Sequence, residues 1–157
     1  MNHSAISSFI WGTADLLRNS FKQHEYGDII LPFTVMRRLD IVLLPTKQKV
    51  FETAQQKLPD ALRDAALKQA SGYDFYNESK FTMESLLDDA DDIKDNILNY
   101  VAAFSPDVLD LFEKFKIYDV IKDLDYADLL FLIIERFCDP QIDLSPSSIC
   151  LLYTSPS

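Results

Sequence analysis

The longest apolar stretch of the chain runs from Tyr26 to Leu44. Its apolar residues at positions 29, 33, 36, 39 and 43 follow one another at steps of three or four, which is the spacing of one face of an α-helix. Further apolar residues occupy most of the remaining circumference, as is typical of a helix that is buried on all sides. The pattern therefore predicts a central helix, with Pro32 in its first turn, around which the other helices pack.

A second stretch of this kind lies between Tyr126 and Phe137. Leucine, isoleucine and phenylalanine occupy most of its positions, so it is also predicted to be a helix that is apolar nearly all round. Asp139-Pro140 ends it, because a residue before a proline is disfavoured in the helical conformation. We expect this second buried helix to pack close to the first.

An amphipathic helix is predicted near the N-terminus. Its expected apolar stripe is Ile6, Ile10, Ala14, Leu17 and Phe21. Trp11 is expected to pack into the core as a large contact residue, and stacking on a ligand is the alternative. Arg18 and Lys22 are one turn apart on the flank of this helix.

Two polar helices are predicted between Thr46 and Gly72, and Pro59 separates them. Each has a narrow apolar stripe, and glycine is the residue that most often ends a helix. Together they are expected to form a helical hairpin that projects from the core. The segment from Tyr73 to Phe81 is the least helical part of the chain, and it is compatible with an extended loop or with one short strand pair near Phe75.

Helical spacing returns in several shorter stretches before the second buried helix. One of them follows the acidic run Asp88–Asp92, and another has Ser105 as its N-cap and Pro106 as its first helical residue. The sequence therefore predicts an all-α fold. It should be a single compact helical domain of about seven or eight helices around two buried helices.

The composition agrees with one globular domain. The chain has 157 residues, of which 48% are hydrophobic and 12% aromatic, so it is long enough to bury a core. No apolar run approaches the roughly 20 residues of a membrane span, and the N-terminus lacks the features of a signal peptide. Cys138 and Cys150 have no metal-binding or disulfide spacing, which favours a reduced, cytoplasmic location. Without a spanning segment, no membrane partner is expected.

The net charge of −10 argues against a chain that grips nucleic acid by itself. The charge is unevenly distributed, however. Residues 1–57 hold seven Lys/Arg and five Asp/Glu, a sum of +2, whereas residues 58–157 hold eight and twenty, a sum of −12. Only the first third is therefore expected to face phosphates, and the acidic remainder is expected to face solvent or a basic partner.

The sequence contains no recognisable catalytic or metal-binding constellation. The run Asp88–Asp92 has four carboxylates in five residues, but a calcium loop requires alternating ligands, a central glycine and a terminal glutamate. Negative charge ahead of a helix N-terminus explains the run more simply. His3 and His24 lie near no serine–acid pair or cysteine. We therefore assign no catalytic, cofactor-binding or metal-ligating residue.

Arg37, Arg38 and Asp40 are the charged residues in the apolar part of the central helix. Successive helical residues point about 100° apart, so the two arginines cannot face the same partner. Arg37 is predicted to form an ion pair with Asp40 one turn away. Arg38 is then left to reach outward.

Several short blocks occur in a recognisable order along the chain. They are Phe9-Ile10-Trp11, Ala14–Arg18, Tyr26-Gly27-Asp28, Leu31–Val35, Arg37–Asp40, Pro45-Thr46-Lys47, Phe75-Tyr76-Asn77, Asn96 with Tyr100, Phe104-Ser105-Pro106, Leu124-Asp125 and Ile142-Asp143-Leu144. In this order they resemble the N-terminal helical domain of the modification (methyltransferase, M) subunit of type I restriction-modification systems. The resemblance extends from about Phe9 to Ile149.

This resemblance implies a function for the parent protein. It would be a site-specific, S-adenosylmethionine-dependent DNA methyltransferase that modifies adenine at N6. Its partners would be a specificity subunit, a second modification subunit, the restriction subunit and DNA, and the helical domain would supply subunit contacts and help to close the clamp around DNA. The glycine-rich cofactor turn and the Asn-Pro-Pro-aromatic motif of the family do not occur in this chain. By itself it is therefore expected to bind no S-adenosylmethionine and to be inactive.

Seven residues are candidates for contact with DNA or with a partner subunit. They are Arg18, Lys22, Arg37, Arg38, Lys47, Lys49 and Asn77. Six of them are basic residues of the first third of the chain, and Asn77 follows an aromatic pair that could stack on a flipped base. For Asn77 the structural alternative is a loop that its aromatic neighbours pin against the core.

Residues 150–157 look foreign to the family. Their sequence, CLLYTSPS, matches the translation of a transposase sequencing adapter. Native sequence is therefore expected at residues 1–149, as an N-terminal domain truncated before the catalytic domain. Two alternatives stay open: a stand-alone acidic helical adaptor for protein interactions without methylation activity, and a helical enzyme whose site the sequence does not reveal.

Overall fold

The computed structural model describes residues 3–139, and this part of the chain consists of eight α-helices and three short 3-10 helices. The α-helices are α1 (His3–Leu17), α2 (Tyr26–Leu43), α3 (Lys47–Ala54), α4 (Asp60–Ser71), α5 (Ile93–Ala102), α6 (Pro106–Lys114), α7 (Ile117–Tyr126) and α8 (Leu130–Phe137). The 3-10 helices are η1 (Gln23–Glu25), η2 (Leu44–Thr46) and η3 (Ser85–Asp88). The predicted all-α fold is confirmed. The predicted foreign tail, residues 150–157, lies outside the described residues.

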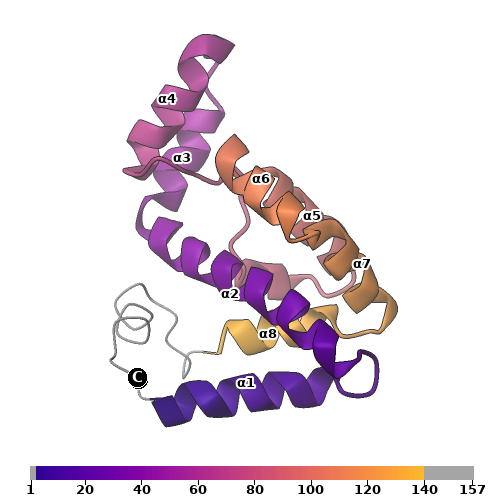
Figure 1. The fold of residues 1–157 in the computed structure, drawn as a ribbon. Coiled ribbons are helices and arrows are strands. Elements are labelled where there is room, and N and C mark those ends of the chain that lie inside the picture. The colour runs from indigo at the N-terminus through magenta and orange to yellow at the C-terminus, as the bar shows by residue number, and fades with distance from the viewer. Residues whose placement is uncertain (1–2, 140–157) are drawn as a thin grey trace.

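Helix α2 crosses the molecule diagonally, with α8 beside it and α5, α6 and α7 along one side (Figure 1). The main core lies between these helices, and Phe33, Ile97, Ile133 and Phe137 are fully buried in it. Phe33 and Phe137 touch directly, with ring centroids 5.9 Å apart. The prediction that α2 and α8 meet in the core is therefore confirmed.

Helix α2 is not buried all round, contrary to the prediction. Phe33 and Met36 are fully buried on one face, whereas Leu31, which points away from that face, is 49% exposed. Leu44, just past the end of the helix, is 53% exposed. Apolar content alone predicted burial on every side, but the helices that contact α2, namely α1, α7 and α8, leave Leu31 half-exposed.

Pro32 also lies deeper in α2 than predicted. The helix begins at Tyr26, so Pro32 occupies its second turn. Because proline has no N–H, the carbonyl oxygen of Asp28 lacks the donor that a regular helix would provide. The proline ring itself is buried.

Helix α8 begins at Leu130, and Tyr126 is the last residue of α7 instead of the first residue of the last helix. Tyr126 is 93% exposed. Between the two helices Asp128 adopts a left-handed conformation with φ of 59°. The N–H groups of Asp128 and Leu129 donate to the carbonyl oxygens of Asp125 and Leu124 at 3.1 and 2.9 Å. These bonds form a Schellman motif, in which glycine is the usual left-handed residue. Because aspartate occupies that position here, the sequence did not indicate that one helix ends at Tyr126 and another begins at Leu130.

The buried face of α1 also differs from the predicted stripe. Phe9, Thr13 and Leu17 are buried, whereas Ile10 is 46% exposed and Trp11 is 70% exposed. The core position predicted for Trp11 is therefore wrong. The stripe was displaced because its middle residue is polar: the Thr13 hydroxyl is buried, and it satisfies its donor by bonding to the carbonyl of Phe9 at 2.7 Å.

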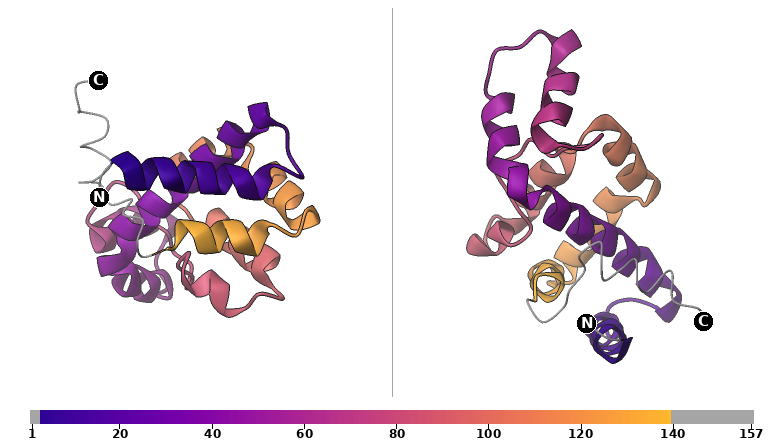
Figure 2. Two further views of the ribbon diagram at one scale, coloured as in Figure 1. Left: turned by 90° about the horizontal axis from the view of Figure 1, so that it is seen from below. Right: turned by 90° about the vertical axis from the view of Figure 1, so that its left-hand side faces the viewer.

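Arg136 of α8 binds this buried face of α1 through its guanidinium group. Its Nε donates to the Thr13 hydroxyl at 2.9 Å, and its Nη2 donates to the Phe9 carbonyl at 3.1 Å. The guanidinium also lies 5.4 Å from the centroid of the Phe9 ring, within the range of a cation–π contact. A Cβ atom at Gly12 would collide with it, so glycine permits the close approach of α1 and α8, which Figure 2 shows side by side.

Helices α3 and α4 form the predicted hairpin, which projects from the rest of the molecule (Figures 1 and 2). It has a small core of its own, formed by Val50, Leu67, Ala70 and Tyr76. Gly72 ends α4 in the left-handed conformation, with φ of 82° and its N–H bonded to the carbonyl of Lys68 at 2.9 Å. The prediction that glycine ends this helix is confirmed.

The segment after the hairpin is an extended loop in the described structure. Asn77 forms one isolated antiparallel bridge with Phe104, and no strand pair is present in residues 3–139. Ser105 is the N-cap of α6, as predicted. Its hydroxyl accepts the N–H of Tyr76 at 3.2 Å, and its N–H donates to the Tyr76 carbonyl at 2.9 Å. The loop is therefore tied to the start of α6.

Candidate functional site

A buried carboxylate, Asp40, lies where α2 meets α5 and the loop after the hairpin. It is 5% exposed and receives three donors. Arg37 Nη1 lies 3.0 Å from its Oδ2, while the Tyr100 hydroxyl and the Met83 N–H donate to its Oδ1 at 2.9 and 3.2 Å. The predicted ion pair between Arg37 and Asp40 is confirmed.

Lys47, the first residue of α3, approaches the same place from the hairpin. Its Nζ donates to Asn77 Oδ1 at 2.9 Å and lies 5.5 Å from the centroid of the Tyr100 ring. Asn77 in turn donates through Nδ2 to the Tyr100 carbonyl at 2.7 Å, and its Oδ1 accepts the Ser79 hydroxyl at 2.8 Å. We refer to Arg37, Asp40, Lys47, Asn77 and Tyr100 as the junction cluster.

Burial dominates the electrostatics of the junction cluster. It raises the pKa of Asp40, although the hydrogen bonds from Tyr100 and Met83 and the charges of Arg37 and Lys47 oppose this shift. Burial lowers the pKa of Lys47 to about 8, against the attraction of Asp40. It also raises the pKa of the Tyr100 phenol well above its ordinary value. Each charge is paired or hydrogen-bonded, so the polar contacts of the cluster hold the hairpin against the core.

The blocks that carry the family resemblance meet in the junction cluster. Arg37 and Asp40, Lys47, Asn77 and Tyr100 come from four separate blocks, and the contacts above join them into one network. Spacing along the sequence gave no sign of this convergence, because Asp40 and Tyr100 are sixty residues apart. The available signals in the sequence were Asp40, a carboxylate within the apolar stretch of the central helix, and Lys47, which follows the end of that stretch.

Three of the seven candidate contact residues therefore lie in the junction cluster. Asn77 is 2% exposed and its amide is engaged on both sides, so the aromatic loop is fastened against the core in this conformation. Arg37 has a side chain only 15% exposed. Contact of these residues with DNA or a subunit stays a prediction.

The other four candidates lie at the surface on different elements. Arg18, in the turn directly after α1, has a side chain 68% exposed and pairs with Asp15. Lys22 and Lys49 are exposed, and Lys22 contributes its backbone N–H to Glu25 at 2.8 Å. Arg38 is half-buried on the outer side of α2 and forms no hydrogen bond or ion pair within residues 3–139. Because α1 and α3 lie at opposite ends of the molecule (Figure 1), these residues form no single basic patch.

Sequence reasoning missed the outer face of α1. Trp11 is 70% exposed and Ile10 is 46% exposed, although large apolar side chains usually pack inside. Arg18 directly follows the last residue of α1 and is also exposed. The polar Thr13 at a core position was the signal that α1 is turned away from the predicted orientation.

The described residues hold no group of three or more histidine, cysteine, aspartate or glutamate side chains that could hold a metal ion. Within the same residues, no helix is long and apolar enough to cross a membrane. The site geometry thus defines the class of the protein as an all-α domain with a buried polar junction and an outward-facing tryptophan.

A family model described as the HsdM N-terminal domain matches residues 6–137. The chain belongs to this family, the N-terminal domains of the methyltransferase (M) subunits of type I restriction-modification systems. No curated protein and no solved structure matches the chain. The match covers α1 to α8, so the family and the described fold coincide.

Proposed function

We propose that this domain is a contact module of the complete modification subunit. It packs against the catalytic domain and the partner subunits and helps to close the assembly around DNA, with modest contact to phosphate. The match to the HsdM N-terminal domain over residues 6–137 carries this proposal. The partners are the specificity subunit, a second modification subunit and the restriction subunit, and the complex works on DNA in the cytoplasm.

The parent enzyme transfers the methyl group of S-adenosylmethionine to N6 of adenine. This reaction belongs to the catalytic part of the parent protein, because neither the glycine-rich cofactor turn nor the Asn-Pro-Pro-aromatic motif occurs in this sequence. Calorimetry with the 157-residue chain and S-adenosylmethionine should therefore give no saturable binding. Saturable micromolar binding would place a cofactor site within this domain and contradict the proposal.

The outer face of α1 supports a contact role. Exposed tryptophan beside exposed isoleucine is typical of the centre of a protein interface, where tryptophan often contributes most of the binding energy. Trp11 and Ile10 supply this pair, and the exposed Arg18 directly follows the end of the helix. The three residues form a short strip of apolar and basic character.

Arg38 on α2 supports a second contact. It points away from the buried face of the helix and has no polar partner within residues 3–139. Its neighbour on that side, Leu31, is 49% exposed. We favour the catalytic domain over DNA as the partner of Arg38, because apolar surface around an arginine suits a protein better than a phosphate backbone.

Assembly of the complete modification subunit with its specificity subunit tests the role of α1. Trp11→Ala should leave the domain folded, since the side chain is exposed, and should weaken assembly about tenfold or more. Leu62→Ala is the matched control, because Leu62 is 59% exposed on the hairpin. Normal assembly and normal methylation by the Trp11→Ala subunit would exclude the α1 contact. A stand-alone adaptor would instead retain a bound partner in the absence of any methylating complex.

A further inference from the structure

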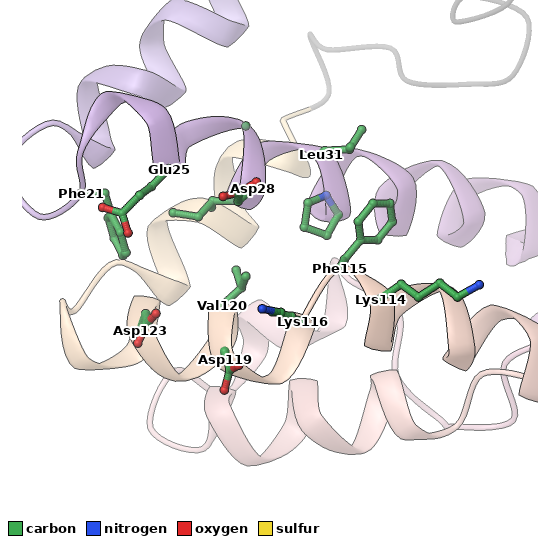
Figure 3. Close-up of a pocket in the computed structure, with 13 residues that line it drawn as sticks. Phe21, Glu25, Asp28, Leu31, Lys114, Phe115, Lys116, Asp119, Val120 and Asp123 are labelled. Carbon is green, nitrogen blue, oxygen red and sulfur yellow. The ribbon is translucent and has the colours of Figure 1, made fainter.

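A groove of about 380 Å³ lies between the N-terminal half of α2 and the junction of α6 with α7 (Figure 3). Its apolar lining includes Phe21, Leu31, Pro32, Phe115 and Val120. Phe115 is half-buried, so part of its ring is available from the groove. None of the lining residues belongs to α1, so the groove is separate from the outer face of that helix.

The charged side chains of the groove are distributed unevenly. Glu25, Asp28, Asp119 and Asp123 gather at one end, and Lys114 extends at the other, as Figure 3 shows. Beyond the acidic end the groove continues into a second hollow of about 430 Å³, which Phe21, Glu25 and Asp123 share and which Tyr126 also lines. Tyr126 is 93% exposed there. The groove therefore combines a carboxylate end with aromatic surfaces.

Three of the carboxylates at this end form no ion pair with the described residues. Within residues 3–139 Asp28, Asp119 and Asp123 form no ion pair, and Lys116, which also lines the groove, pairs with none of them. Acceptors that the domain leaves without donors suit a guest that is rich in donors.

We propose that this groove binds a segment of a partner protein that carries lysine or arginine together with leucine-like side chains. The basic groups lie against Glu25, Asp28, Asp119 and Asp123, and the apolar side chains cover Phe115 and Pro32. Long basic side chains suit this mixture because their aliphatic stems pack on aromatic rings while their charged ends meet carboxylates. The same carboxylates repel phosphate, so nucleic acid is excluded as the occupant. The proposal stands independently of the parent enzyme's activity.

Fluorescence anisotropy with the 157-residue chain tests the proposal. The probe is a fluorescein-labelled peptide of arginine, leucine and alanine, and a second peptide has glutamate in place of arginine. Saturable binding is expected for the first peptide and none for the second. Binding of both peptides with equal affinity, or saturable binding of neither, would overturn the proposal.

Charge substitutions inside and outside the groove locate the binding site. The double variant Asp119→Asn/Asp123→Asn should weaken binding of the basic peptide about fivefold, the scale of two partly exposed ion pairs. Lys116→Gln should strengthen it about twofold, because it removes a repelling charge. The control, Asp74→Asn/Asp91→Asn, removes two exposed carboxylates elsewhere and should leave binding unchanged. Equal weakening by both double variants would show that only the net charge attracts the peptide.

Leu31→Ser tests the apolar part of the groove. Leu31 lines it and is 49% exposed, so the substitution should not unfold the domain. Affinity for the arginine–leucine peptide should fall about threefold, while affinity for a peptide with serine in place of leucine should not change. An unchanged affinity for the leucine-containing peptide would contradict the predicted apolar contact.

Discussion

The two parts of the molecule are held together in different ways. The body, formed by α1, α2 and α5–α8, has a large continuous apolar core to which every one of these helices contributes. The hairpin of α3 and α4 contributes three buried residues to its small core, and Tyr76 of the following loop adds a fourth. At its base it depends on polar contacts instead, among them Thr46 to the Ser71 carbonyl at 3.0 Å, Arg63 to Glu78 at 2.7 Å and Tyr76 to Asp64 at 2.8 Å.

This difference bears on how the domain opens. Apolar burial is non-directional and grows with the area removed from water, so the large core stabilises the body without relying on individual contacts. Hydrogen bonds require defined distances and directions, so they fix the orientation of an element that has little core of its own. The hairpin should therefore open locally at a lower free energy than the body unfolds. The junction cluster, where Lys47 meets Asp40 and Asn77, is the point at which the two parts are coupled.

The largest effect is expected in the core of the body. Ile133→Ala removes a fully buried side chain of α8 and should lower the free energy of unfolding by about 2–5 kcal/mol, because it leaves a cavity among rigid neighbours. Urea denaturation followed by circular dichroism measures the loss. Leu39→Ala, at a half-buried position of α2, should cost less. A cost below about 0.5 kcal/mol at both positions would mean that the core lies elsewhere.

A smaller and local effect is expected in the core of the hairpin. Leu67→Ala should cost about 2–3 kcal/mol, at the low end of the range for such changes, since only a few side chains surround the site and can relax. Hydrogen exchange should become faster at the amides of α3 and α4 and stay unchanged in α5 and α7. Uniform acceleration throughout the domain would show that the hairpin and the body unfold as one unit.

Lys47→Met should reveal the coupling between hairpin and body. At pH 7 it should cost about 1 kcal/mol through the lost hydrogen bond to Asn77. In the wild type the folded state releases the Lys47 proton at its pKa of about 8, whereas the unfolded chain keeps it up to about 10.5. The unfolded state then binds more protons between these values, so wild-type stability should rise with pH across this window.

The effect of Lys47 is isolated by comparing the pH dependence of the free energy of unfolding in the wild type with that in Lys47→Met. Burial raises the pKa of Cys138 to about 11, which acts in the opposite sense at alkaline pH but equally in both. Lys47→Met cannot titrate at this position, so the cost of the substitution should grow between about pH 8 and pH 10. Parallel stability curves for the two proteins would show that Lys47 is not buried as a cation in the junction cluster.

The same contrast explains which structural features could be predicted from the sequence. Apolar spacing identified α2, the hairpin and the all-α class, and Gly72 and Ser105 marked helix ends through their own backbone chemistry. Errors arose where a polar or charged residue takes an unusual role. Thr13 occupies a core position through a hydrogen bond, and Asp128 ends α7 in a conformation that glycine usually adopts.

The other features that the sequence did not predict are contacts between residues far apart along the chain. The ion pair of Arg37 with Asp40 is local and was predictable from helical spacing. The bonds from Lys47 to Asn77 and from Tyr100 to Asp40 join residues thirty and sixty positions apart. No periodicity within one element encodes such contacts. The groove beside α2 was equally hidden, because its acidic residues come from η1, α2 and α7.

The smallest effect on stability, and the sharpest on function, is expected from two surface changes. Arg38→Ala on the body and Lys49→Ala on the hairpin remove side chains without hydrogen bonds or ion pairs to the described residues. Each should change the free energy of unfolding by less than about 0.5 kcal/mol. They therefore allow a comparison of the two parts by function alone.

If the body makes the contact with the catalytic domain, Arg38→Ala should weaken assembly or turnover of the complete enzyme, and Lys49→Ala should not. If Arg38 instead reaches DNA phosphate, the slope of log affinity against log salt should fall by roughly one unit, with sequence preference unchanged. Loss of function in Lys49→Ala alone would move the interface to the hairpin. Normal assembly, normal salt dependence and normal turnover of the Arg38→Ala enzyme would leave Arg38 as an ordinary surface residue of α2.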